Sequence, residues 1–281
     1  MAIPPTPRVP RAHLPRAFEI GPTGSRLAGM PIPSSAAGRF AAGLALPFRG
    51  LAYLAGRRAL WKYALLPMVL TLVGLVAGLA VAAPVSRGIL TLLWGEPEGL
   101  LAAAWWVARA ALYLVLVFVA AVALPVTVSA PFSDWLSARI EAFEMGERDG
   151  GGLSRAVAEA WVGAAHAFSR LAVFLLGHAI LLPALLVPFA YPVLAFLWTA
   201  RWTAVEYLDL PMARNLHRLR EVRAALAAVR PLGEGFGVIL AAAFLLPLAN
   251  LLIVPVGAVA GTLLYCDLVR AGHVARQAPP P

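Results

Sequence analysis

The sequence has few charged residues and almost no cysteine. Only 13% of its 281 residues are charged, whereas about a quarter are charged in an average soluble domain, and 61% are hydrophobic. This composition excludes a soluble globular domain and indicates an all-α integral membrane protein with one polytopic domain. Cys266 is the only cysteine, so a disulfide or a thiolate metal cluster within the chain is excluded as well.

Motifs that mark common enzyme classes are also missing. The glycines at 150–152 are not followed by the Lys-Ser or Lys-Thr of a phosphate-binding loop. The histidines do not have metal-ligand spacing, so neither a metal nor a cofactor is expected. Asp134, Glu141 and Glu144 share one polar helix but have no accompanying nucleophile, and we expect them to be solvated. An enzyme is therefore the weakest function class.

The net charge of +9 has two possible sources. Basic patches attract nucleic acid, but the cytoplasmic flanks of membrane segments also carry excess Lys and Arg. We favour the second source and expect no nucleic-acid partner. Residues 1–40 are rich in Pro and Arg and lack the apolar run of a signal peptide. We predict a disordered basic tail over 1–40, a single membrane domain over 41–272 and a short tail over 273–281.

Two uncharged runs predict long transmembrane helices. Residues 64–85 would form about 33 Å of helix, enough to cross a hydrocarbon core of about 30 Å, and residues 110–130 supply a second crossing. Before the first run, residues 40–62 mix aromatic and basic residues and predict an amphipathic helix at the membrane surface. After the second run, we predict a separate polar helix capped by Ser133 or Asp134.

Two further apolar segments, 171–200 and 236–266, fit neither one crossing nor two. A single helix over either segment would be about 45 Å long, which exceeds the hydrocarbon core. Two complete spans would each be too short to cross it. We predict two helical hairpins that enter and leave the membrane on the same side, with arms of about 17 Å. Pairs of short complete crossings are the alternative. The predicted turns are at the prolines of these segments: Pro183, Pro188, Pro192, Pro247 and Pro255.

The distribution of Lys and Arg supports this topology. The chain up to Lys62 carries nine of these residues, and residues 131–170 carry four. With the N-terminus in the cytoplasm, two crossings return residues 131–170 to the cytoplasm, as the positive-inside rule requires. A hairpin over 171–200 then keeps the arginines of 214–230 inside, and a second hairpin places the C-terminus there too.

A chain that turns within the membrane exposes the N-terminus of its second arm, which favours an anion. Pro255 suits the first turn of such an arm, and Asn250 can donate its amide to a bound oxyanion. Gly257 and Gly261 permit close approach. Under the other interpretation, the prolines only make the turn and Asn250 satisfies loose carbonyl groups.

Four stretches resemble the CysZ-type sulfate permeases of the etoposide-induced-protein superfamily. They are "LPFRGLAYL" (46–54), "APFSDWLSARIE" (130–141), "EYLDLPMARN" (206–215) and "GFGVILAAAFLLPLANLLIVPVGAVAGTLLYCDLVR" (235–270). The resemblance implies an oligomeric protein of the bacterial inner membrane. It also implies two long spans, partly penetrating hairpins and import of sulfate for cysteine synthesis.

The resemblance also implies substrate-binding residues. Members of the family have paired basic residues shortly before the first span, and these are tied to sulfate. The matching positions here are Trp61 and Lys62, so only Lys62 is retained, and we hypothesise that Arg57 and Arg58, one turn earlier, substitute for the missing cation. We expect Asp209 to cap the helix that follows it.

The sequence thus favours a permease for sulfate or a related oxyanion, working without nucleotide hydrolysis as a homo-oligomer in contact with membrane lipid. Charge at the cytoplasmic face would hold the dianion, and the hairpin tips would replace its hydration shell. The alternative is a membrane scaffold without transport activity, which binds anionic lipid through basic amphipathic helices.

Overall fold

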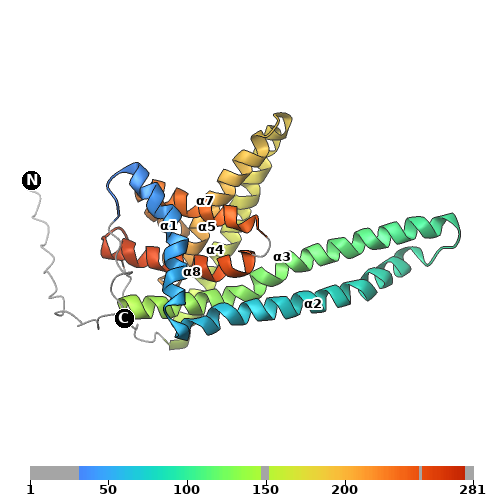
Figure 1. The fold of residues 1–281 in the computed structure, drawn as a ribbon, viewed down its shortest axis with the longest axis horizontal. Coiled ribbons are helices and arrows are strands. Elements are labelled where there is room, and N and C mark those ends of the chain that lie inside the picture. The colour runs from blue at the N-terminus through green and yellow to red at the C-terminus, as the bar shows by residue number, and fades with distance from the viewer. Residues whose placement is uncertain (1–31, 147–151, 247–248, 276–281) are drawn as a thin grey trace, which may run out of the picture.

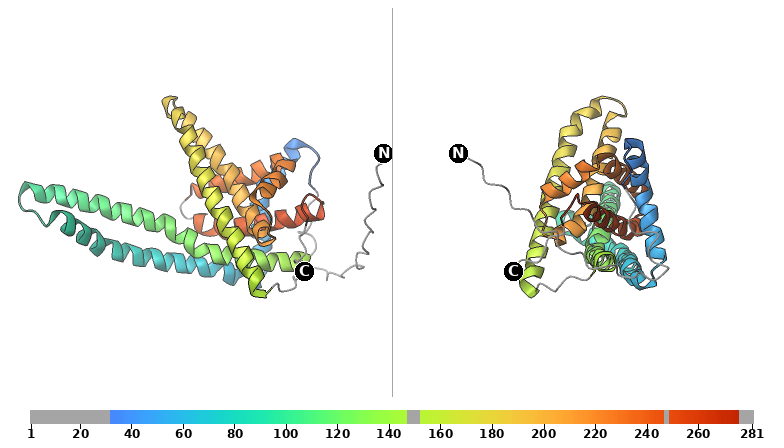
Figure 2. Two further views of the ribbon diagram at one scale, coloured as in Figure 1. Left: turned by 180° about the vertical axis from the view of Figure 1, so that it is seen from behind. Right: turned by 90° about the vertical axis from the view of Figure 1, so that its left-hand side faces the viewer.

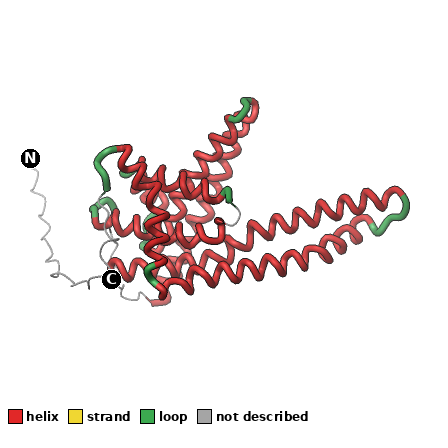
Figure 3. Tube along the Cα trace, in the orientation of Figure 1, coloured by secondary structure: helices red, strands yellow, loops and turns green. Residues whose placement is uncertain are grey.

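The computed structural model describes residues 32–146, 152–246 and 249–275, and helices make up the regular structure of these ranges (Figure 3). In chain order they are α1 (Ala36–Ala55), α2 (Arg58–Trp94), α3 (Leu100–Met145), α4 (Gly152–Leu181), the 3-10 helix η1 (Leu182–Leu186), α5 (Ala190–Arg214), α6 (Leu219–Ala228), α7 (Arg230–Phe244) and α8 (Ala249–Arg270).

Three helical hairpins share one body. The α2–α3 hairpin extends furthest from it, the α4–α5 hairpin leaves in a second direction, and the α7–α8 hairpin stays within it (Figure 1). The opposite view in Figure 2 shows the same arrangement. Helix α1 packs against α7 and α8, and α8 also contacts α3 and α5. The ends of α1, α3, α5 and α8 thus meet in the body, away from the hairpin tips.

The two predicted long spans are confirmed, but the helices exceed the uncharged runs. Helix α2 has 37 residues and α3 has 46, or about 55 and 69 Å. The predicted break at Ser133 or Asp134 is wrong, because α3 continues through Pro131 to Met145. Both helices end at glycines with positive φ, Gly95 at 73° and Gly146 at 83°. The polar helix of the sequence prediction is therefore the last third of α3.

The first predicted hairpin is formed by α4 and α5, with a turn at the expected place. Pro183 lies in η1, Pro188 follows it in the turn, and Pro192 lies in the first turn of α5, where a missing N–H costs little. The arms are longer than predicted, because α4 already begins at Gly152. Helix α1 likewise begins at Ala36, inside the stretch predicted to be a tail.

The second predicted hairpin is formed by α7 and α8, but one of its prolines is not in the turn. Helix α7 ends at Phe244 and α8 begins at Ala249, so Pro255 lies inside α8, which corrects its assignment to the turn. Pro247 is outside the described residues. Packing explains the difference: α8 is enclosed by neighbouring helices that hold both of its halves in line across the lost hydrogen bond.

Four of the described helices are long and apolar enough to cross a membrane. They comprise Arg58–Trp94, Leu100–Ala121, Val157–Leu186 and Leu252–Arg270. The number is up to five if α6 and α7, which meet at an angle of 106°, count as one broken span. In the first three, 17% or less of the apolar window is buried in the protein, whereas 78% of that of the last is buried. The first two hairpins therefore present apolar surface that suits lipid, and protein surrounds α8.

Glycines allow the helices of the body to approach closely. A Cβ on Gly43 of α1 would lie 2.1 Å from the carbonyl oxygen of Leu232 in α7, and one on Gly235 would lie 2.3 Å from that of Phe40. Gly257 and Gly261 of α8 do permit close approach, and the group that approaches is Tyr207 of α5, with its ring against the first and its backbone against the second. In membrane proteins, such small residues replace the hydrophobic driving force between helices.

The α1–α7 crossing gives a stability prediction. We expect Gly43→Ala to lower the free energy of unfolding by about 1–3 kcal/mol, because the new methyl group overlaps the backbone of α7. Gly163→Ala is the matched control, since a Cβ there meets no atom within 4 Å. Thermal unfolding in detergent measures both variants, and equal melting temperatures would contradict the close crossing.

Candidate functional site

The four family-like stretches meet in the body. They lie on α1, the last part of α3, the end of α5 and the α7–α8 hairpin, and buried polar side chains join them. We call the largest group the Asp267 cluster. Its members are Arg49, Tyr53, Arg57, Glu144, Asp267 and Arg270.

A buried ion pair between α1 and α8 forms one half of the Asp267 cluster. The guanidinium of Arg49 binds both carboxylate oxygens of Asp267, the longer contact being 3.3 Å, and the side chains are 5% and 6% exposed. Arg270, one turn further along α8, approaches the same carboxylate at 3.4 Å. Two cations therefore share Asp267. The Arg49–Asp267 pair joins residues that are 218 positions apart.

Glu144 of α3 forms the other half. Its carboxylate accepts hydrogen bonds of 2.8 Å from the Tyr53 hydroxyl and from Arg270, and Arg57 approaches within 3.8 Å. The Arg57 guanidinium also lies 3.6 Å above the centre of the Tyr53 ring. The Glu144 side chain is 5% exposed, so the expectation that it is solvated is wrong. Its charge is instead stabilised by three partners.

A second group, the Glu141 cluster, lies beside the first. Asn215 donates to Glu141 at 3.2 Å, and Arg214 contacts the same carboxylate at 3.7 Å. Arg214 also donates to the Ser137 hydroxyl at 2.7 Å, and the Thr262 hydroxyl of α8 donates to Ser137 at the same distance. Glu141 is 3% exposed and is also not solvated. These contacts hold α3, α5 and α8 together.

A third group, the Asp209 cluster, joins α4 to α5. Asp209 does not cap the following helix as predicted. It lies inside α5, 2% exposed, and accepts hydrogen bonds from Arg170 and from His166 Nδ1, the latter at 2.7 Å. Since a carboxylate only accepts, Nδ1 carries the proton. Sequence reasoning missed this group, although the three charged or polar residues in otherwise apolar helices were the available signal.

The predicted substrate-binding cations lie together at the α1–α2 junction. Arg57 precedes the first residue of α2, and Arg58 and Lys62 are one turn apart on its exposed surface. The Lys62 amine lies 5.0 Å from the centre of the Tyr63 ring, and Arg139 of α3 interacts with the Tyr63 hydroxyl. We call Arg57, Arg58, Lys62 and Arg139 the basic junction. It adjoins the Asp267 cluster through Arg57.

Asn250 is not part of this group. It is the second residue of α8, and its side chain lies outside the described residues. Seventeen residues of helix, about 25 Å, separate it from Asp267. The structure therefore separates Asn250 from the basic junction by most of the length of α8. Among the described residues, no three His, Cys, Asp or Glu side chains are grouped as metal ligands would be.

This geometry defines a polytopic helical membrane protein with a buried polar centre and a basic junction at one end. A match to the family described as "Sulfate transporter CysZ/Etoposide-induced protein 2.4" covers residues 46–255. The chain belongs to this family.

Curated relatives match over a shorter region. The sulfate transporters CysZ of Salmonella typhimurium and of Salmonella typhi are each 33% identical to the chain over 82 residues. This region is 29% of the chain and 32% of each relative. The chain thus spans about a third of the length of these relatives.

The Asp267 cluster gives a second stability prediction. We expect Asp267→Asn to lower the free energy of unfolding by about 3–5 kcal/mol, because it leaves the buried Arg49 without its carboxylate. The double variant Arg49→Met/Asp267→Leu should recover most of this loss. Glu234→Gln breaks the exposed Arg230–Glu234 pair and should cost at most about 1 kcal/mol. If Asp267→Asn melts at the same temperature as Glu234→Gln, the buried pair does not stabilise the fold as predicted.

Tyr53 gives a pH prediction. Burial, and then the nearby Glu144 carboxylate, raise the pKa of Tyr53 well above its usual 10.0. Because the unfolded chain loses this proton first, the Tyr53 contribution to stability is complete below pH 10 and is lost as the pH rises further. Above pH 10 the wild type should therefore lose stability faster than Tyr53→Phe. Melting curves recorded at several pH values measure the difference, and parallel curves would disprove the coupling.

Proposed function

We propose that the protein is an inner-membrane permease that imports sulfate or a related oxyanion for cysteine synthesis, without nucleotide hydrolysis. The observation that carries this proposal is the family match over residues 46–255, which includes the whole basic junction. The Salmonella relatives, named as sulfate transporters, support the choice of substrate.

The basic junction is the proposed entry point for the anion. Arg57 already contacts Glu144, so Arg58 and Lys62, both exposed and on one helix face, are the proposed first contacts. Ammonium and guanidinium groups form strong charge-assisted hydrogen bonds to oxyanions. Because the junction is exposed, its attraction for the anion should weaken with ionic strength.

The N-terminus of α8 is the proposed second stage. There, free backbone N–H groups and the Asn250 amide would replace part of the hydration shell of the anion. The length of about 25 Å along α8 between Asn250 and Asp267, whose cluster adjoins the junction, favours two stations on one route over a single site. Pro255 is then a structural residue of α8 and not part of the anion contact.

The same arrangement supports a topology. Cations gather where α1 and α2 meet and where α3, α5 and α8 end, at the opposite side of the molecule from the α2–α3 tip (Figure 1). By the positive-inside rule this side faces the cytoplasm, together with both termini. Hairpins that end within the membrane need cover from protein, which supports a homo-oligomer with lipid around it.

A scaffold without transport activity is the second candidate. Helix α6 packs its apolar face, which includes Val222, Ala225 and Leu226, into the protein and leaves its arginines exposed. Exposed cations attract anionic lipid headgroups without moving any solute. Transport assays separate the two functions, because a scaffold leaves sulfate flux at the level of empty vesicles.

Uptake of radiolabelled sulfate into proteoliposomes tests the proposal. We expect Arg58→Ala/Lys62→Ala to lower the initial rate by about tenfold or more, since two charge-assisted contacts are removed. Arg87→Ala is the matched control: it removes a cation from the other end of the same helix, where Arg87 pairs with Glu96.

Two results would decide against the proposal. Wild-type flux equal to that of empty vesicles favours the scaffold. If the wild type transports sulfate and the double variant transports it equally fast, the basic junction is not on the route.

A further inference from the structure

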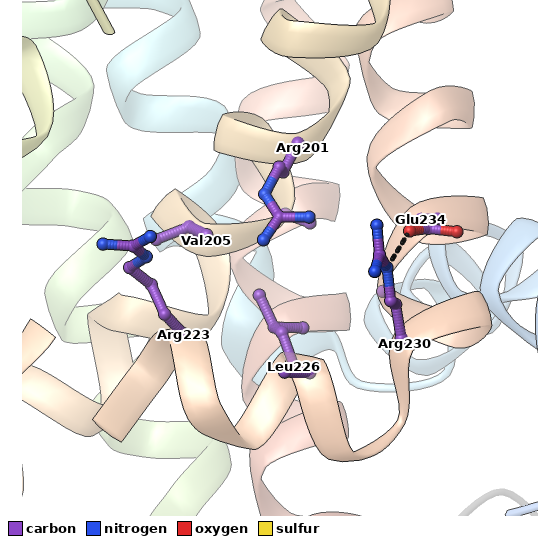
Figure 4. A pocket seen from close by; sticks show the side chains of 9 residues that line it. Arg201, Val205, Arg223, Leu226, Arg230 and Glu234 are labelled. Atoms are coloured by element: carbon purple, nitrogen blue, oxygen red, sulfur yellow. Dashed lines mark hydrogen bonds and ion pairs between the residues drawn. The ribbon is translucent and has the colours of Figure 1, made fainter. Parts of the chain in front are cut away.

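A pocket between α5, α6 and α7 is lined by three arginines and lies outside both the basic junction and the polar clusters. Its volume is about 80 Å³. Arg201 comes from α5, Arg223 from α6 and Arg230 from the first residue of α7 (Figure 4). The sharp turn of 106° between α6 and α7 brings the last two to the same pocket.

The charges of the pocket do not balance. Arg230 donates to Glu234 at 2.7 Å, and Glu234 is the one carboxylate among the lining residues. Arg201 lies between this pair and Arg223 in Figure 4. The Arg223 guanidinium lies 5.8 Å from the centre of the Trp202 ring, which helps to hold it beside α5. Three guanidinium groups and one carboxylate leave an excess of two positive charges, with Val205 and Leu226 as an apolar wall.

The pocket lies at the boundary between apolar and polar surface on two helices. Along α5, the exposed side chains are apolar up to Leu197, and the next exposed side chain beyond it is that of Arg201. Along α7, the tip residues Leu245 and Leu246 are exposed. Twelve residues, or about 18 Å of helix, separate Arg201 from Phe189 at the α4–α5 tip. The same length separates Glu234 from Leu246 at the end of α7.

The pocket lies at headgroup depth on the proposal above that the hairpins end within the membrane. About 18 Å is roughly half of a bilayer with its interfaces, so tips near its centre put the pocket at the membrane surface. Trp198, half-buried one turn before Arg201, is a residue type that is common at membrane interfaces. Basic pockets between helices at this depth bind phosphate headgroups.

We propose that the pocket formed by Arg201, Arg223 and Arg230 binds one tetrahedral oxyanion, supplied by a phospholipid headgroup or by free sulfate or phosphate. The planar guanidinium groups match two oxygens of such a group at a time. The apolar wall accommodates the glycerol end of a lipid. This site is independent of the proposed transport function, because binding here requires no flux.

Binding to the purified full-length protein in uncharged detergent tests the proposal. The probes are short-chain phosphatidylglycerol, short-chain phosphatidylcholine, sodium sulfate and sodium phosphate, titrated by calorimetry. We expect Arg201→Gln/Arg223→Gln to weaken the binding of at least one of the anionic probes by about tenfold or more. Arg218→Gln/Arg220→Gln removes two cations around the start of α6, outside the pocket, and should change the affinity by less than about twofold.

A gain-of-affinity variant guards against a trivial loss through unfolding. Glu234→Gln removes the carboxylate of the pocket and frees Arg230, so it should tighten the binding of the same probe by about threefold or more. If Arg201→Gln/Arg223→Gln weakens the binding of phosphatidylglycerol but not of sulfate or phosphate, the headgroup is the source, and the reverse result identifies the free ion.

The proposal is overturned if Arg201→Gln/Arg223→Gln and Glu234→Gln both bind every probe as the wild type does. It is also overturned if the control Arg218→Gln/Arg220→Gln weakens binding as much as the pocket variant, because diffuse charge is then sufficient. Neither result depends on sulfate uptake, so the proposed transport function is tested separately.

Discussion

The buried ion pair between Arg49 and Asp267 is the contact on which the arrangement of the body depends. It fixes α1 against α8, and Arg270 extends it to Glu144 and hence to α3. Between helices in lipid, burial of apolar surface provides little driving force, since acyl chains are as apolar as leucine. Buried polar contacts therefore determine which helices associate and in which register. Breaking one partner leaves a buried charge, which makes the network sensitive to single substitutions.

Close backbone packing works together with these polar contacts. Helix α1 reaches α7 at Gly43 and Gly235, and α5 reaches α8 at Gly257 and Gly261. As a result, α8 has a protein environment along most of its length, although its composition suits lipid. That environment also explains how α8 keeps Pro255 in its interior. The proposed anion route would then follow a helix that protein, and not lipid, surrounds.

The sequence predicted the elements that local composition determines. The uncharged runs at 64–85 and 110–130 specify long helices, and the prolines near residue 188 specify a turn. Pro255 did not mark the second turn, because helix packing decides whether a proline bends a chain. Burial of Glu144 was also not predictable from its own helix, whose polar neighbours suggest a solvated surface. Its partner Tyr53 is 91 residues away, and such pairings leave no periodic signal. The pocket at Arg201 likewise depends on the turn between α6 and α7.

The length of the α2–α3 hairpin has a consequence for its fit to the bilayer. Apolar side chains are exposed on α2 from Leu65 to Leu93, about 42 Å of helix, and the exposed Arg87–Glu96 pair lies near the hairpin tip. A hydrocarbon layer of about 30 Å cannot cover this surface if the helices stand upright. Hydrophobic mismatch therefore inclines the hairpin or thickens the surrounding lipid, and the resting angle of the hairpin becomes a function of membrane thickness.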